Sequence, residues 1–236
     1  MKWTSAADSH KGNHRSHNED AVFCSSDSAL WLVADGMGGH NAGEYASEAI
    51  AQSLSEVTLS GDLGDCVDAI EDRLLEVNDH LRQHAREHCE GQTVGSTVVV
   101  LVARGDVGVV LWAGDSRLYR LRNEHFEMIT RDHNPVADLY DHGGATEDEV
   151  LNADTNVVTR AVGGQHDLHL DVAVFTIEKG DTLLLCSDGL YREIDAADLS
   201  RSLSQEVDVA VDDLMARCLN GAARDNVSLV VTRAMA

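Results

Sequence analysis

Acidic residues stand at the ends of several apolar runs that are typical of β-strands. Asp35 follows the run "ALWLVA" and Asp188 follows "DTLLLCS", and a glycine comes directly after each aspartate. Further acidic positions lie just before or between such runs: Glu19 and Asp20 in "HRSHNEDAVF", Asp115 in "LWAGDSRLYRL" and Asp225 in "ARDNVSLVVT". Because strand ends at one edge of a β-sandwich lie close together, we expect these carboxylates to converge on one cleft.

Converging carboxylates indicate a cation site. Clustered carboxylates repel one another, and each resists ionisation unless a cation is present. A ligand set made of oxygen atoms, without a cluster of His or Cys, suits Mg²⁺ or Mn²⁺ better than Zn²⁺. A glycine after the aspartate lets the backbone approach an ion without a side chain in the way. An Asp-Gly pair at a strand end is also a frequent turn, so the metal-site hypothesis depends on all the acids together.

The elements that must position these acids can be predicted from apolar periodicity. Short turns at Arg104-Gly105-Asp106 and Asn123-Glu124 join neighbouring runs and favour antiparallel hairpins. Apolar residues at three- and four-residue steps predict amphipathic helices over 65–89 and around 207–218, and a further helix begins near Asn41. Strands are predicted at 29–34, 97–103, 107–113, 117–122, 125–130, 170–177, 181–187 and 226–233.

Composition limits the classes of function. The 236 residues, of which 43% are hydrophobic, are enough for one domain with a sizeable core. A formal net charge of -23 argues against a general nucleic-acid or anionic-membrane binder, because the overall field repels both. The five cysteines are scattered and never form a C-x-x-C pair, which fits reduced thiols. The longest apolar runs are strand-sized. We expect a cytoplasmic monomer that binds neither nucleic acid nor membrane.

Taken together, the motifs identify a family. They closely resemble the bacterial branch of the metal-dependent serine/threonine protein phosphatases, the type 2C family, across roughly residues 4–233. The resemblance implies an α+β fold with four layers (αββα), in which two antiparallel sheets are flanked by antiparallel helices. It also implies one phosphatase domain over 1–236, with a flap at about 134–157 that contacts substrate. The matching segments are "RSHNEDA", "VADGMGGHNAGEYAS", "GSTVVVLV", "WAGDSRLYRL", "ITRDHNPV", "NVVTRAVGG", "LLLCSDGLYREI" and "ARDNVSLVVTR".

The resemblance assigns a role to each acidic position. It makes Asp35 the bridging ligand of two Mn²⁺ or Mg²⁺ ions, and Gly36 a ligand through its carbonyl. The other implied metal residues are Asp188 and Asp225 as ligands of one ion, Glu19 and Asp20 near the metals through bound water, and Asp115 for a third, weaker ion. Ions of this kind would lower the pKa of a bridging water, which then attacks phosphorus without a protein nucleophile.

Substrate contacts are implied at two further positions. Arg15, which begins the R-x-x-N-E-D match, is expected to bind the substrate phosphate, because a guanidinium offers two donors to two oxygens. Eukaryotic members place a histidine after Asp-Gly as a general acid, whereas this chain has Met37. A serine alkoxide leaves poorly unless it is protonated. Metal-bound water or His40 is the candidate proton donor, and a solvent-facing loop histidine is the alternative interpretation of His40.

The expected function is hydrolysis of phosphoserine and phosphothreonine in proteins by a metal-activated water, in opposition to a serine/threonine kinase. The alternative is a catalytically weak member of the same fold that binds phosphoproteins or regulates a kinase. A thiol phosphatase built on Cys186 is not supported, because no C-x5-R loop surrounds that residue. His80, His84 and His88 share one face of the predicted helix, where they line a solvated border or bind a soft metal.

Overall fold

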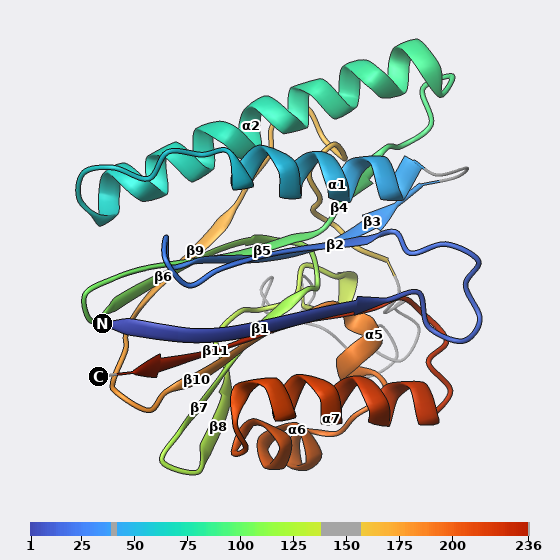
Figure 1. Cartoon of the computed structure of the whole chain (residues 1–236). Helices are drawn as coiled ribbons and strands as arrows, with labels where there is room; N and C mark the ends of the chain where they lie inside the picture. Colours follow the sequence, from blue (N-terminus) through green and yellow to red (C-terminus); the bar gives the residue numbers. More distant parts are fainter. Residues whose placement is uncertain (39–41, 138–156, 236) are drawn as a thin grey trace.

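Two antiparallel sheets form the centre of the molecule, and helices cover the outer face of each sheet (Figure 1). The computed structural model describes residues 1–38, 42–137 and 157–235. The chain ends lie side by side, because the first and last strands pair from Lys2 with Met235 to His10 with Val227. The two sheets and the two outer layers of helices confirm the expected four-layer arrangement.

The first sheet contains both ends of the described chain. Its strand order is β1-β11-β10-β7-β8, and every neighbouring pair is antiparallel. Its strands are β1 (Lys2–His10), β11 (Val227–Met235), β10 (Thr182–Cys186), β7 (Arg117–Arg122) and β8 (His125–Met128).

The second sheet has the order β2-β3-β5-β6-β9, with β4 added beside β3. The expected hairpin over Arg104-Gly105-Asp106 joins β5 to β6, and the turn at Asn123-Glu124 joins β7 to β8 in the first sheet. The strands of the second sheet are β2 (Asp20–Ser25), β3 (Leu30–Met37), β4 (Gly95–Ser96), β5 (Val98–Arg104), β6 (Val107–Ala113) and β9 (Asp171–Thr176).

Two pairs of helices form the outer layers. Helices α1 (Ala42–Ser55) and α2 (Leu63–His88) cover the second sheet, whereas α6 (Ala196–Leu203) and α7 (Val207–Asn220) cover the first (Figure 1). A capping box fixes the start of α2: Asp62 accepts from the backbone of Asp65, and Asp65 accepts from that of Asp62. The one-turn helix α5 (Asp188–Tyr191) follows β10 directly.

The central strands, such as β3 and β5, read as continuous apolar runs because both of their faces are buried. In β3, Leu30, Leu32 and Ala34 pack under α1 and α2. The alternate residues Trp31 and Val33 face the other sheet and join the core between the sheets. This period of two buries successive side chains in different layers.

The predicted strands and the three predicted helices are all present, but some elements were missed. Strand β1 has the sequence KWTSAADSH, whose polar residues suit an edge strand and hide its pairing with β11. Helices α5 and α6 span only 4 and 8 residues, too few to show a clear helical period. Most of the predicted flap, residues 138–156, lies outside the described residues.

Two expectations from composition can be compared with the structure. All five cysteines are unpaired within the described structure, and Cys186 is fully buried under the helices of the first sheet, as a structural residue would be. No helix in the described part of the chain has the length and apolarity needed to span a membrane.

Candidate metal centre

The predicted acids meet at one end of the sandwich, where strands of both sheets begin or end. Asp20, the first residue of β2, pairs directly with Asp35 near the end of β3. Asp188 begins α5 after β10, and Asp225 lies just before β11. Asp115 occupies the turn between β6 and β7. The expected convergence follows from this register.

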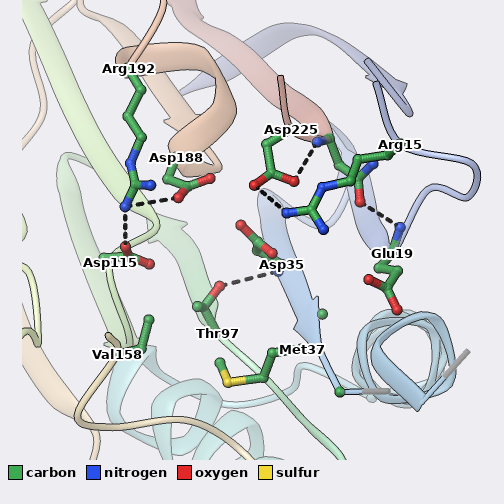
Figure 2. Close-up of a pocket in the computed structure, with 13 residues that line it drawn as sticks. Arg15, Glu19, Asp35, Met37, Thr97, Asp115, Val158, Asp188, Arg192 and Asp225 are labelled. Atoms are coloured by element: carbon green, nitrogen blue, oxygen red, sulfur yellow. Dashed lines mark hydrogen bonds and ion pairs between the residues drawn. The ribbon is translucent and has the colours of Figure 1, made fainter. Parts of the chain in front are cut away.

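The side chains surround a cleft of about 400 Å³. Asp35 lies in the middle of the view, with Arg15 and Asp225 on one side and Arg192 and Asp188 on the other (Figure 2). The residues that line the cleft are Arg15, Glu19, Asp35, Gly36, Met37, Gly38, Thr97, Asp115, Val158, Asp188, Arg192, Asp225 and Asn226.

Asp35 is buried among the other acids of the site. Burial raises its pKa well above the ordinary value, and the neighbouring carboxylates of Asp20 and Asp188 raise it further. The backbone of Asp35 is fixed by Thr97, whose Oγ1 accepts from the Asp35 N–H at 3.1 Å. A carboxylate in this position ionises readily only when positive charge is supplied nearby.

Asp20 pairs with Asp35 across neighbouring strands and accepts a hydrogen bond from the hydroxyl of Ser187, the residue after β10. Ser187 Oγ donates to Asp20 Oδ2 at 2.8 Å, and the same Oγ accepts from the N–H of Ser228 at 3.0 Å. Burial is the main reason that the pKa of Asp20 rises to about 7, although hydrogen bonds from Ser228 and Ser187 oppose the rise. Asp20 Oδ1 is buried and has no partner among the described residues.

Arg15, Asp225 and Asn226 form the side of the cleft near the first strand. Arg15 Nη2 donates to Asp225 Oδ2 at 2.8 Å, and both side chains are partly exposed. Asn226 Oδ1 accepts from the N–H of Glu19 at 2.9 Å. Its amide group donates to the carbonyls of Lys11 and His17, so Asn226 ties the Arg15 loop to the start of β11.

Asp115 and Asp188 form the opposite side. A single nitrogen of Arg192 lies 3.0 Å from Asp188 Oδ2 and 3.6 Å from Asp115 Oδ2 (Figure 2). Burial, followed by repulsion from Asp188, raises the pKa of Asp115 to about 6. The hydroxyl of Tyr191 donates to the Asp115 carbonyl at 3.0 Å and holds this turn against α5.

Gly36 brings the backbone of three segments into close contact. Its N–H donates to the Glu19 carbonyl at 3.0 Å. A Cβ at this position would lie 2.1 Å from the carbonyl oxygen of Gly43 and 2.4 Å from that of Glu19. Only glycine fits here, and the absence of a side chain also leaves the backbone of residue 36 open to the cleft.

The donor set fits a hard divalent cation. It consists of carboxylate and backbone oxygens, and two of the buried carboxylate oxygens, Asp20 Oδ1 and Asp188 Oδ1, have no partner in the described structure. Within residues 1–38, 42–137 and 157–235, however, no three His, Cys, Asp or Glu side chains stand together as a finished ligand group. Two arginines already contact these acids: Arg15 contacts Asp225, and Arg192 contacts Asp188 and Asp115.

Comparison with known proteins identifies the family. The model of the family described as "Protein phosphatase 2C" matches residues 8–228. The chain is 33% identical to a serine/threonine phosphatase named stp from Listeria innocua, over 85% of each chain. The chain belongs to the protein phosphatase 2C family. The resemblance inferred from the motifs is therefore confirmed.

Solved structures share the fold of this family member. PppA, described as a key regulatory component of T6SS in Pseudomonas aeruginosa, superposes with a TM-score of 0.91 at 41% identity, over 100% of this chain and 99% of that one. The catalytic domain of the serine/threonine phosphatase PstP, solved in complex with 2 manganese ions, superposes with a TM-score of 0.86 at 30% identity. That comparison covers 100% of this chain and 99% of the other.

Most of the predicted site residues of this phosphatase 2C chain meet in the cleft. Asp20 is not among the lining residues but pairs with Asp35, which is, and His40 lies outside the described residues. Six lining residues were not predicted as site residues: Met37, Gly38, Thr97, Val158, Arg192 and Asn226. Arg192 stands four residues after Asp188, a spacing that brings side chains together only if a helix begins at Asp188.

The histidines of α2 form a ladder of stacked rings. The Tyr45 ring stacks on that of His84 with centroids 4.1 Å apart, and His84 stacks on His88 at 4.6 Å. Tyr45 is also hydrogen bonded to His80, with 2.6 Å between the hydroxyl and Nε2. They are not part of any potential metal-binding group among the described residues. His80 and His88 are exposed and His84 is partly exposed, which favours the interpretation as a solvated helix border.

Proposed function

We propose that this chain hydrolyses phosphoserine and phosphothreonine in proteins, using two Mn²⁺ or Mg²⁺ ions and a third, weaker ion at Asp115. The observation that carries this proposal is the position of Asp35, which lies among four other aspartates and whose pKa is raised by burial and by their charges. Burying repelling carboxylates destabilises a fold unless cations compensate them. Family membership and the manganese-bound relative support the same conclusion.

Different residues around the cleft would have different roles in binding the ions. Asp35 would be the bridging ligand of two ions, and the carbonyl of Gly36 would be a ligand next to it. Asp188 and Asp225 would be ligands from the two sides, while Glu19 and Asp20 would act through bound water. Such ions supply a water of lowered pKa as nucleophile and neutralise the phosphoryl oxygens.

Arg15 would bind the substrate phosphate. Its guanidinium already contacts a carboxylate oxygen of Asp225 at 2.8 Å, and the side chain is 52% exposed, so it is available from solvent. A phosphate dianion presents the same pattern of paired oxygens as a carboxylate, with more charge. We expect Arg15 to exchange Asp225 for phosphate when substrate and ions are bound.

Position 37 bears on the fate of the leaving group. Met37 lines the cleft, and its thioether has no proton to give to a serine or threonine alkoxide. The proton must therefore come from water or from a residue other than Met37. A role for His40 in this step stays a prediction.

Hydrolysis of a phosphothreonine peptide tests the proposed function. We expect release of phosphate with Mn²⁺, loss of release with a chelator, and recovery when Mn²⁺ is restored. Turnover that does not depend on metal, or no turnover with Mn²⁺, would contradict the proposal. A variant with Asp106→Asn, in the turn that joins β5 and β6 and outside the cleft lining, serves as the matched control because it removes one carboxylate elsewhere.

The biological setting stays a prediction. A protein phosphatase of this specificity opposes a serine/threonine kinase, so deletion of the gene should raise phosphate on serine or threonine sites of proteins. Phosphoproteomics of a deletion strain would measure this directly, and no gain at any such site would contradict the protein-substrate assignment. The single domain over 1–236, the substrate flap at 134–157, the monomeric state and the cytoplasmic location are also predictions.

A further inference from the structure

Arg192 places a positive charge between two acids that have separate expected roles in metal binding. Its Nη2 atom lies 3.0 Å from Asp188 Oδ2 and 3.6 Å from Asp115 Oδ2. The same nitrogen makes both contacts, so the guanidinium stands where the two carboxylates approach each other (Figure 2). A divalent cation shared by Asp115 and Asp188 would need the same space.

The backbone that carries Arg192 is fixed. The N–H of Arg192 donates to the carbonyl of Asp188 at 3.0 Å and closes the single turn of α5. Tyr191 is held by its hydrogen bond to the Asp115 carbonyl at 3.0 Å, and the Arg117 guanidinium lies 3.5 Å from the centre of its ring. The turn therefore keeps its place whether or not the Arg192 side chain moves.

The side chain of Arg192 is more exposed than the two acids that it contacts. It is 36% exposed, whereas the side chains of Asp115 and Asp188 are 5% and 12% exposed. The guanidinium is the most exposed of the three groups and stands on a long side chain, so we expect it to be the part that moves when an ion enters.

An independent observation shows that Asp188 is not satisfied by Arg192 alone. Asp188 as a whole residue is 8% exposed, and its Oδ1 is buried without a hydrogen-bond partner among the described residues. A buried carboxylate oxygen in this condition is destabilising unless a cation or a donor reaches it. Asp188 lines the cleft, so a ligand in the cleft is the group that can do so.

We propose that the side chain of Arg192 competes with divalent cations for Asp115 and Asp188. The guanidinium must be displaced from these two acids before an ion binds between them. This inference rests on the proposed function and adds a determinant of metal affinity to it. While no ion is bound, the guanidinium offsets the repulsion between the two acids. When an ion enters, the positive charge of Arg192 opposes it, which keeps the ion at Asp115 weakly bound.

Direct measurement of Mn²⁺ binding tests the proposal without relying on turnover. Electron paramagnetic resonance of free Mn²⁺ and titration calorimetry would give the number of ions and their dissociation constants. We expect Arg192→Met, which keeps the length of the side chain but removes its charge, to tighten the weakest Mn²⁺ site by about tenfold, or about 1.4 kcal/mol. Arg192→Lys, which keeps the charge, should bind Mn²⁺ much as the wild-type protein does.

The location of the effect is tested with Asp115→Asn. We expect this change to abolish the weakest Mn²⁺ site in both the wild-type and the Arg192→Met background. If Arg192 had only a structural role, its replacement would damage the site and weaken Mn²⁺ binding. Tighter Mn²⁺ binding in Arg192→Met is therefore a change in the opposite direction, which a merely structural role does not produce. Unchanged or weakened binding in Arg192→Met would overturn the role of Arg192. Absence of any Mn²⁺ binding by the wild-type protein would instead contradict the proposed function itself.

Discussion

Asp35 and Thr97 are hydrogen bonded to each other twice, between the end of β3 and the residue before β5. The Asp35 N–H donates to Thr97 Oγ1 at 3.1 Å, and the Thr97 N–H donates to the Asp35 carbonyl at 2.9 Å. Thr97 Oγ1 also shares a hydrogen bond of 2.7 Å with the hydroxyl of Ser116, beside Asp115. One buried hydroxyl therefore links the proposed bridging ligand to the turn of the proposed third ion.

Thr97→Val should show how much this hydroxyl contributes to the stability of the protein. Valine keeps the shape of threonine but leaves the Asp35 N–H and the Ser116 hydroxyl without their partner. An unsatisfied buried donor destabilises a protein by about 1–3 kcal/mol, which corresponds to a fall of roughly 2–12 °C in Tm for a domain of this size. Thermal unfolding would measure the fall. Thr97→Ser keeps the hydroxyl and serves as the control; equal stability of the valine variant and the wild-type protein would contradict the link.

Asp35→Asn should affect activity and stability in opposite directions. Loss of the bridging charge removes the proposed ion site, and we expect kcat on a phosphothreonine peptide to fall by a factor on the order of 10³. In the metal-free protein the same change removes a buried charge that four aspartates repel, so its Tm should rise. Near-normal turnover would show that the reaction centre is elsewhere. Asp106→Asn is the control for both measurements.

Much of the fold can be predicted from the sequence because its strands are buried on both faces. The apolar runs at 97–103 and 107–113 became β5 and β6, whose residues alternate between two core layers. Strand β1 escaped detection because an edge strand with the sequence KWTSAADSH lacks that signal. Its nine pairs with β11 join the two ends of the chain, a relationship that local periodicity does not contain.

The acids of the site were predictable, whereas the residues that hold them were not. Asp35 and Asp188 end apolar runs before a glycine, which is visible in the sequence. The contact of Ser187 with Asp20 joins residues 167 positions apart and depends on how the two sheets stack. Arg192 was missed because α5 has only 4 residues, too few for a helical pattern. Its closeness to Asp115 arises from tertiary packing alone.

Gly36→Ala should disrupt the site through the backbone. The new Cβ would lie 2.1 Å from the carbonyl oxygen of Gly43, a fixed backbone atom that cannot rotate away. We expect a loss of stability of about 3 kcal/mol or more, since overpacking against an immobile group costs typically 1–3 kcal/mol even where side chains can adjust. Chemical denaturation would measure the loss. Gly221→Ala, where the nearest atom would be 3.3 Å from the Cβ, is the control and should change stability much less.

The metal-free protein should lose stability as pH rises from about 4 to about 7. Burial raises the pKa of Asp20 to about 7 and that of Asp115 to about 6, from an ordinary value of 3.8. Between these values the folded chain holds protons that the unfolded chain has released. The stability linked to these two groups is therefore fully present below pH 3.8 and is lost as pH passes through the folded-state values.

Thermal unfolding of chelator-treated protein across this pH window would measure that loss. Each pKa unit corresponds to about 1.4 kcal/mol, so we expect Asp20→Asn, which keeps the shape of the side chain without its charge, to flatten the fall in Tm clearly. Asp106→Asn should leave it unchanged. Mn²⁺ at pH 7 should restore Tm in the wild-type protein, because a cation binds the ionised acids of the folded state. Two outcomes would contradict the electrostatic account of the cleft: a Tm of the metal-free wild-type protein that rises from pH 4 to pH 7, or a fall in Asp20→Asn as large as in the wild-type protein.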